Sequence, residues 1–213
     1  MIRVLPPAPC APPFAPAAGR SRLSAGALLL LGLLLPASAS AQEGPAARGL
    51  LTQHRRVTRL LERPASRARE RRLDRALDRA LDYEMITRRA LVVHWEDLSA
   101  AQREEVTDLL HRAIARRYRA SLEELRGWTV EVLEERPRGP GYRVVTEARH
   151  DGERRRIEYD MLRTGGEWRI VDVIHEGDSL IHQYRRQFDR VIRREGWDGF
   201  VRRLRADVDD DAG

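Results

Sequence analysis

The apolar residues of the chain recur with two different periods, and the change of period divides the chain into a helical part and a sheet part. Up to Gly127 they recur at spacings of three and four, which is typical of helices with one buried face. This pattern predicts helices over residues 50–62 and 65–90, the second broken near Tyr83, and a third that starts at Ser99 and ends at Gly127. Residues 42–47 are predicted to form a flexible leader before them.

Two features mark where these helices begin and end. Pro64 stops the first helix, because proline lacks the N–H that a helix interior needs. Ser99-Ala100-Ala101-Gln102 matches a capping box, in which the side chains of Ser99 and Gln102 each accept a hydrogen bond from the other's backbone N–H. The third helix is therefore expected to start at Ser99.

Beyond Gly127 the apolar residues alternate with polar ones, which is the period of a strand with one buried face. Four alternating segments are separated by short turns at Pro137–Gly141, Asp151-Gly152 and Gly165-Gly166, so they are predicted to pair as an antiparallel meander. A helical pattern then returns. Ser179 is expected to cap this helix and Gly196 to end it.

The order of elements predicts an α+β fold. N-terminal helices come first, a four-stranded antiparallel sheet follows, and C-terminal helices pack over it, with a short last helix over Trp197–Leu204. We expect the folded domain to span residues 42–206 and the acidic residues 207–213 to be disordered.

The first 41 residues resemble a secretory signal peptide. Arg20 and Arg22 precede an apolar run over 23–35, and the small residues Ala39-Ser40-Ala41 follow. The run is shorter than the roughly 20 apolar residues that a membrane-spanning helix needs. We therefore expect cleavage after Ala41 and a periplasmic protein, with an uncleaved membrane anchor as the alternative.

Composition excludes several classes of site. Cys10 is the only cysteine and precedes the proposed cleavage point, so the mature chain has no disulfide or cysteine ligand. The formal charge is +6, of which three arginines belong to the first 41 residues. Basic and acidic residues interleave along the predicted helices, which favours solvated faces over a nucleic-acid interface. Six scattered histidines and the absence of a glycine-rich phosphate loop predict neither a metal nor a cofactor site.

Two short motifs resemble parts of a serine hydrolase. Gly177-Asp178-Ser179-Leu180 and Asp172-Val173-Ile174-His175 spell the nucleophile and the Asp-x-x-His segment of one lipase and esterase family. Their order along the chain is reversed. Asp172 and His175 also lie three apart on a strand, so their side chains face opposite sides of the sheet. We interpret Ser179 as a helix cap and predict no enzymatic activity.

What remains is a large apolar surface on the predicted helices and on one face of the sheet. These residues either fill a solid core or line a cavity for an apolar ligand, and periodicity does not distinguish the two.

Several blocks of the sequence resemble the MlaC-type, or toluene-tolerance, family. The blocks lie between Leu73 and Leu204, and together they are specific. They are Asp82–Thr87, Ala90-Leu91, His94-Trp95, Leu98-Ser99, Gln102, Tyr118, Trp168–Val173, His175–Leu180 and Tyr184–Phe188. The chain departs from the family pattern with Val92 in place of a glycine, Asp178 in place of an apolar residue, and Val106, Leu109 and Leu110 in place of phenylalanines.

This resemblance implies a periplasmic phospholipid carrier that holds acyl chains in an apolar cavity. Its partners would be an outer-membrane lipoprotein complex and an inner-membrane ABC transporter. The residues expected to contact lipid are Trp95, Leu109, Ala113, Tyr118, Val130, Val144, Tyr159, Met161, Trp168, Ile170, Ile174, Tyr184 and Phe188. A serine esterase on a similar α+β fold and a lipid-free envelope scaffold remain the alternatives.

Overall fold

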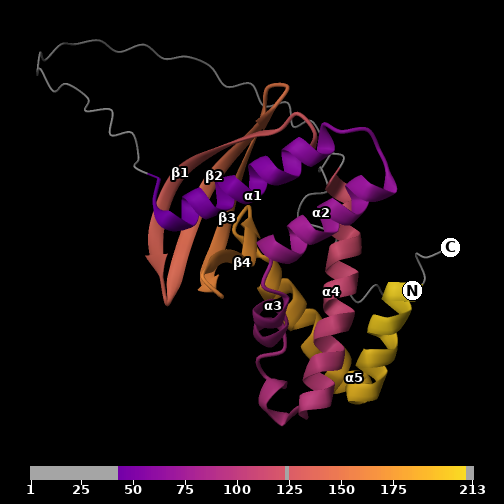
Figure 1. Ribbon diagram of the computed structural model, residues 1–213. Helices are drawn as coiled ribbons and strands as arrows, with labels where there is room; N and C mark the ends of the chain where they lie inside the picture. Colours follow the sequence, from indigo (N-terminus) through magenta and orange to yellow (C-terminus); the bar gives the residue numbers. More distant parts are fainter. Residues whose placement is uncertain (1–42, 123–124, 210–213) are drawn as a thin grey trace, which may run out of the picture.

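The computed structural model describes residues 43–122 and 125–209, which form an α+β domain (Figure 1). The proposed signal peptide, residues 1–41, lies outside the described residues. Within the described part, no helix is both long enough and apolar enough to cross a bilayer.

The N-terminal part is helical, as the sequence predicts. Its elements are α1 (Pro45–Leu61), α2 (Arg67–Ala80), α3 (Tyr83–Ala90), the short 3-10 helix η1 (Trp95–Asp97) and α4 (Ala100–Leu122). The break expected near Tyr83 is confirmed: Leu81 and Asp82 separate α2 from α3, and the Asp82 carboxylate accepts a 3.0 Å hydrogen bond from the Met85 N–H. The capping box is also confirmed, with distances of 2.9 Å and 3.2 Å between Ser99 and Gln102.

The prediction of a flexible leader over residues 42–47 is wrong for residues 45–47. The helix α1 already begins at Pro45, and proline is favoured at a first helical position because its missing N–H is not needed there. Ala46 and Ala47 are fully buried, and the Ala47 N–H donates a 2.7 Å hydrogen bond to the Glu135 carboxylate of the sheet. This long-range contact anchors the start of α1.

The sheet has five antiparallel strands in chain order, one more than predicted. They are β1 (Thr129–Arg138), β2 (Gly141–His150), β3 (Glu153–Thr164), β4 (Glu167–His175) and β5 (Asp178–Ser179). The extra strand has only two residues, which the sequence pattern is too short to indicate, and it pairs with the end of β4. The strand β1 also extends through Pro137 and Arg138, so the first turn is shorter than predicted.

The last helical segment, α5 (Leu180–Asp209), consists of two helices that meet at Gly196. Gly196 has φ of 72°, a left-handed conformation that ends the first helix as expected. The second helix continues to Asp209, and residues 210–213 lie outside the described residues.

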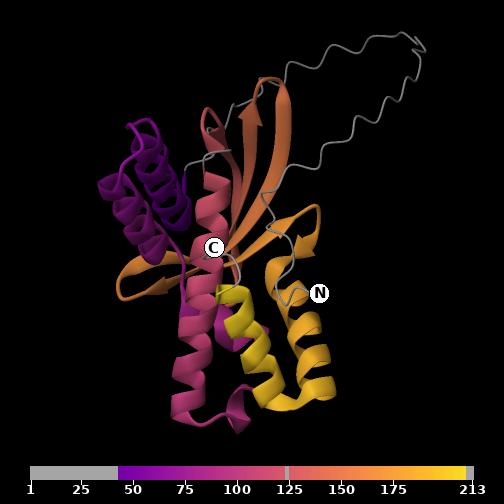
Figure 2. The same cartoon turned by 90° about the vertical axis from the view of Figure 1, so that its right-hand side faces the viewer.

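The domain has two parts along its length (Figure 2). At one end α1 and α2 pack against the twisted sheet, and at the other α3, α4 and both halves of α5 form a helical bundle. The main core joins the bundle to the sheet, and a smaller cluster of Leu61, Leu73, Leu77 and Leu122 lies between α1, α2 and α4.

Candidate functional site

A cavity of 450 Å³ lies between α1, α2, the end of α4 and one face of the sheet. Its wall is mostly apolar. The apolar and aromatic lining residues are Leu50, Val57, Leu77, Ala80, Leu81, Tyr118, Leu122, Leu125, Trp128, Val130, Ala148, Ile157, Tyr159, Ile170 and Val173.

The helical side of this wall follows from helix periodicity. On α1, the residues Leu50, Gln53, His54 and Val57 all line the cavity, and their spacing of three and four places them on one face. This helix lies across the sheet (Figure 1), so the same face is turned toward the strands.

The strand side of the wall depends on a β-bulge. Val130 and Ala148 are register partners on β1 and β2, as are Tyr159 and Val173 on β3 and β4, and all four line the cavity. Ile170 lines it as well, although it lies three residues before Val173 and would face away in a regular strand. The β3–β4 register shifts between Asp160 and Met161, so that Met161 pairs with Ile170. The bulge therefore returns Ile170 to the cavity face.

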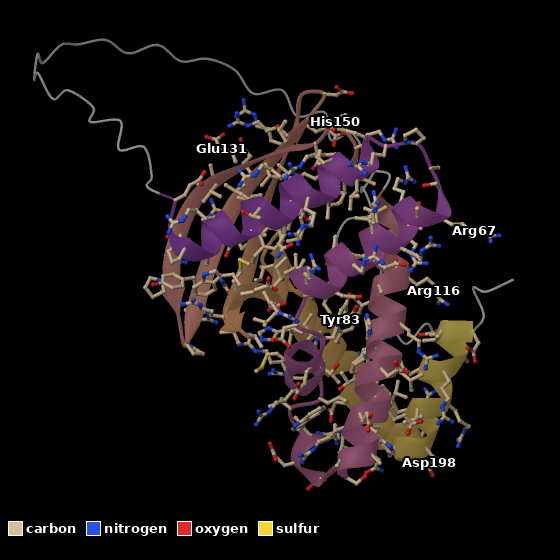
Figure 3. The ribbon with its side chains drawn as sticks, in the orientation of Figure 1. Arg67, Tyr83, Arg116, Glu131, His150 and Asp198 are labelled. Atoms are coloured by element: carbon tan, nitrogen blue, oxygen red, sulfur yellow. The ribbon has the colours of Figure 1, made fainter. Side chains whose placement is uncertain are left out.

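The mouth of the cavity is polar. Figure 3 shows His150 at the tip of the β2–β3 hairpin, where the lining also includes Asp151, Glu153 and Arg155. The Arg155 guanidinium lies 4.4 Å from the ring centre of Trp128 and forms a 2.8 Å ion pair with Glu153. An apolar wall with charged groups at one end fits a ligand that has an apolar body and a polar end.

A histidine also lines the helical side of the cavity. Burial, and secondarily the neighbouring Arg55 guanidinium, lower the pKa of His54 below its ordinary value. The His54 ring is therefore neutral at neutral pH, which keeps the α1 side of the cavity uncharged.

The hydrolase motifs do not form a catalytic triad. The Ser179 hydroxyl donates a 2.6 Å hydrogen bond to the Asp172 carboxylate and accepts a 3.1 Å hydrogen bond from the His182 N–H, which makes Ser179 the cap of α5. His175 lines the cavity, and no hydrogen bond joins a histidine side chain to the Ser179 hydroxyl in the described residues. Ser179 therefore lacks the serine–histidine pair that activates the nucleophile of a catalytic triad. The described residues also contain no cluster of three or more side chains suited to a metal ion.

The structure places the thirteen predicted lipid contacts in two groups. Tyr118, Val130, Tyr159 and Ile170 line the cavity. The other nine do not line it: they are Trp95, Leu109, Ala113, Val144, Met161, Trp168, Ile174, Tyr184 and Phe188.

Most of this second group fills the core. Phe188 is fully buried, with its ring centre 5.4 Å from that of Tyr184 and 5.0 Å from that of Phe200. Trp168 packs edge-on against Tyr142 and lies against Gly49 of α1. Sequence reasoning missed the α1 and α2 residues of the wall, although their spacing marks an apolar stripe. Neither helix contains an aromatic residue, and every aromatic candidate lay in a later segment.

The fold and the cavity together define an α+β domain in which helices close one face of a twisted sheet around an apolar space. The chain belongs to the MlaC protein family, since a model of that family matches residues 53–206. No curated protein matches the sequence.

Among solved structures, a phospholipid-binding protein from Ralstonia solanacearum, determined in complex with a phospholipid, has a similar fold. The two chains share 21% identity with a TM-score of 0.66, and the similarity covers 78% of this chain and 98% of the other. At this identity the likeness establishes the α+β fold.

Proposed function

We propose that this protein is a periplasmic phospholipid carrier that encloses acyl chains in the cavity between α1, α2 and the sheet. The observation that carries the proposal is the 450 Å³ apolar cavity with its polar mouth, found in a chain of the MlaC family. The phospholipid bound to the structurally similar Ralstonia protein supports the choice of ligand.

The energetics of the cavity suit such a ligand. Each CH₂ group removed from water contributes about 0.8 kcal/mol, so an acyl chain of ordinary length binds tightly without any charged contact. The headgroup would remain at the mouth, near His150 and Arg155. Escape into water would then be slow, and release would require contact with a partner that receives the lipid.

In this proposal residues 1–41 are a signal peptide that directs the chain to the periplasm. The carrier exchanges lipid with an outer-membrane lipoprotein complex and an inner-membrane ABC transporter, and it catalyses no reaction. The capping role of Ser179 supports a binding function over an esterase.

Native mass spectrometry of the protein purified from a bacterial host tests this function. We expect a complex with one or more phospholipids, whose mass identifies the headgroup and the number of acyl chains. Protein that repeatedly carries no lipid, and takes up none from vesicles, contradicts the proposal. Ester hydrolysis that is lost in Ser179→Ala would instead favour an enzyme.

A further inference from the structure

The outer side of the α1–α2 pair carries two rows of arginines. One row is Arg56 and Arg59 of α1 with Arg63 just beyond its end, and the other is Arg72, Arg75 and Arg79 of α2. Both rows have the spacing i, i+3, i+7. This spacing places the α2 row along one side of its helix, and it does the same for Arg56 and Arg59 on α1. With Leu60 and Ala76 they line a groove of 310 Å³ that contains no carboxylate, which we call the arginine groove.

The charge in the arginine groove is not balanced by acidic side chains. Within the described residues, none of the six guanidinium groups forms an ion pair with a carboxylate. The Arg56 guanidinium donates a 3.4 Å hydrogen bond to the Gln53 amide oxygen, and the Arg59 guanidinium donates a 3.2 Å hydrogen bond to the backbone carbonyl of Arg55. The six positive charges that line this groove repel one another, and a bound anionic surface would relieve that repulsion.

Several arginines elsewhere on the domain are paired with carboxylates. Arg149 lies between Glu147 and Glu131, and Arg203 lies within 2.5 Å of Glu195. The difference extends to whole segments. Residues 43–80 contain eleven arginines and five acidic residues, whereas residues 81–213 contain twenty-five arginines and twenty-eight acidic residues. The α1–α2 pair is thus a positive region next to a slightly negative remainder of the domain, residues 81–213.

We propose that the arginine groove docks this protein onto an anionic membrane surface through the phosphate groups of its lipid headgroups. Guanidinium keeps its positive charge throughout the physiological pH range, so all six groups attract phosphate. The α2 row extends over about 10 Å at 1.5 Å per residue, so the six charges are spread too widely for one phosphate ion and match an array of headgroups. Basic residues near an anionic bilayer are attracted in proportion to their number.

The arginine groove lies on the same two helices that form one wall of the cavity. The inner sides of the same helices line the cavity with Val57 and Leu77, so docking would place the cavity wall next to the bilayer. The attraction itself depends on charge alone and does not rest on the proposed function. A protein that carries no lipid could still bind anionic vesicles, and the reverse also holds.

Sedimentation of the full chain with vesicles tests the proposal. We expect it to partition onto vesicles of phosphatidylglycerol mixed with phosphatidylcholine and to be released when sodium chloride is raised to about 0.5 M, where the Debye length is only a few ångströms. The quantity measured is the difference from pure phosphatidylcholine vesicles. Residues 1–41, with Arg3, Arg20 and Arg22, are the same in every variant compared below, so their charge-dependent contribution cancels in that comparison. Equal binding to both kinds of vesicle would overturn the proposal.

Matched triple variants locate the binding surface. The change R72Q/R75Q/R79Q should lower the partition coefficient by roughly a hundredfold, at about fivefold per arginine. The control R186Q/R190Q/R193Q makes the same charge change at similar helical spacing on α5, which lies on the other side of the domain (Figure 2), and should lower it by less than about tenfold. Equal losses in the two triples would mean that net charge alone acts, which overturns an assignment to the arginine groove.

A last pair of measurements separates a membrane surface from a small anion. Replacement of the same three arginines by lysine keeps the charge but removes the two-pronged donor geometry, and it should retain binding within about threefold because the attraction follows charge. Millimolar inorganic phosphate at constant ionic strength should leave vesicle binding unchanged. Loss of binding in either measurement would identify a phosphate-ion site and contradict docking onto a bilayer.

Discussion

The carboxylate of Asp172 accepts a 2.6 Å hydrogen bond from the hydroxyl of Ser179, seven residues later in the chain. The other oxygen of Asp172 accepts a 3.1 Å hydrogen bond from the N–H of Ile181. Asp172 lies in β4, Ser179 lies immediately before α5 as its cap, and Ile181 lies in the first turn of α5, so one buried side chain ties the start of the helix to the sheet. Asp172 and Ser179, which resemble parts of a catalytic motif in sequence, therefore stabilise the junction between β4 and α5.

Loss of this carboxylate should loosen the start of α5. We expect Asp172→Ala to lower the free energy of unfolding by about 1–3 kcal/mol, because it leaves the Ser179 hydroxyl and the Ile181 N–H without their acceptor. Asp172→Asn keeps one acceptor oxygen and should lose less than half as much. Urea unfolding followed by circular dichroism measures both, and equal losses would show that the hydrogen bonds contribute little.

The same residue should make stability depend on pH. Burial raises the pKa of Asp172 above its ordinary 3.8, as does the nearby Asp160 carboxylate, and the hydrogen bonds from Ser179 and Ile181 only partly oppose this. A carboxyl group with a raised folded-state pKa binds its proton more tightly in the folded chain. Its contribution to stability is therefore fully present below pH 3.8 and is lost as the pH rises through the raised value.

The direction of this pH dependence of stability can be measured by comparison with Asp172→Asn, whose side chain is neutral at every pH. As the pH rises from about 4 to about 7, the wild type should lose stability relative to Asp172→Asn, because only the wild-type residue becomes charged. Unfolding free energies determined at several pH values for both proteins give the difference directly. A difference that grows in favour of the wild type over this range contradicts the prediction.

Filling the cavity should reduce lipid loading without unfolding the domain. Ala148 on β2 and its register partner Val130 on β1 both line the cavity. The change Ala148→Trp therefore places an indole in the space that an acyl chain would occupy. We expect the lipid-bound fraction in native mass spectrometry to fall by at least about tenfold, as about 1.4 kcal/mol of lost acyl-chain burial would suffice. Leu133→Trp is the control, since Leu133 is 40% exposed and does not line the cavity.

A charge on the cavity wall should act differently from a charge in the core. Tyr159 is partly buried and lines the cavity, so the arginine of Tyr159→Arg can extend into open space, lowering lipid loading while the domain stays folded. Met161 is 1% exposed and lies outside the cavity, so Met161→Arg buries an unpaired charge and should cost several kcal/mol of stability. Thermal unfolding and lipid content, measured on both variants, separate the two effects. Similar unfolding of both would show that Tyr159 is a core residue.

Features that depend on a few neighbouring residues could be predicted from the sequence. The capping box at Ser99, the break before Tyr83 and the end of a helix at Gly196 all rest on hydrogen bonds or backbone angles within a single turn. The α+β order of elements follows from the change of period at Gly127, because periodicity records which side of each element is buried. Where a distant residue intervened, as Glu135 does at the start of α1, the prediction was wrong.

The location of the cavity was decided by tertiary structure. Tyr159 and Tyr184 both belong to apolar stripes, yet Tyr159 lines the cavity and Tyr184 stacks on Phe188 inside the bundle. An apolar stripe indicates only that one face of a helix or strand is shielded from water. Tertiary packing decides whether another side chain or an open cavity lies against that face. A single bulge in β4 turns Ile170 toward the cavity, and the crossing of α1 over the sheet encloses it. Both depend on contacts between segments far apart in the chain, which local periodicity does not record.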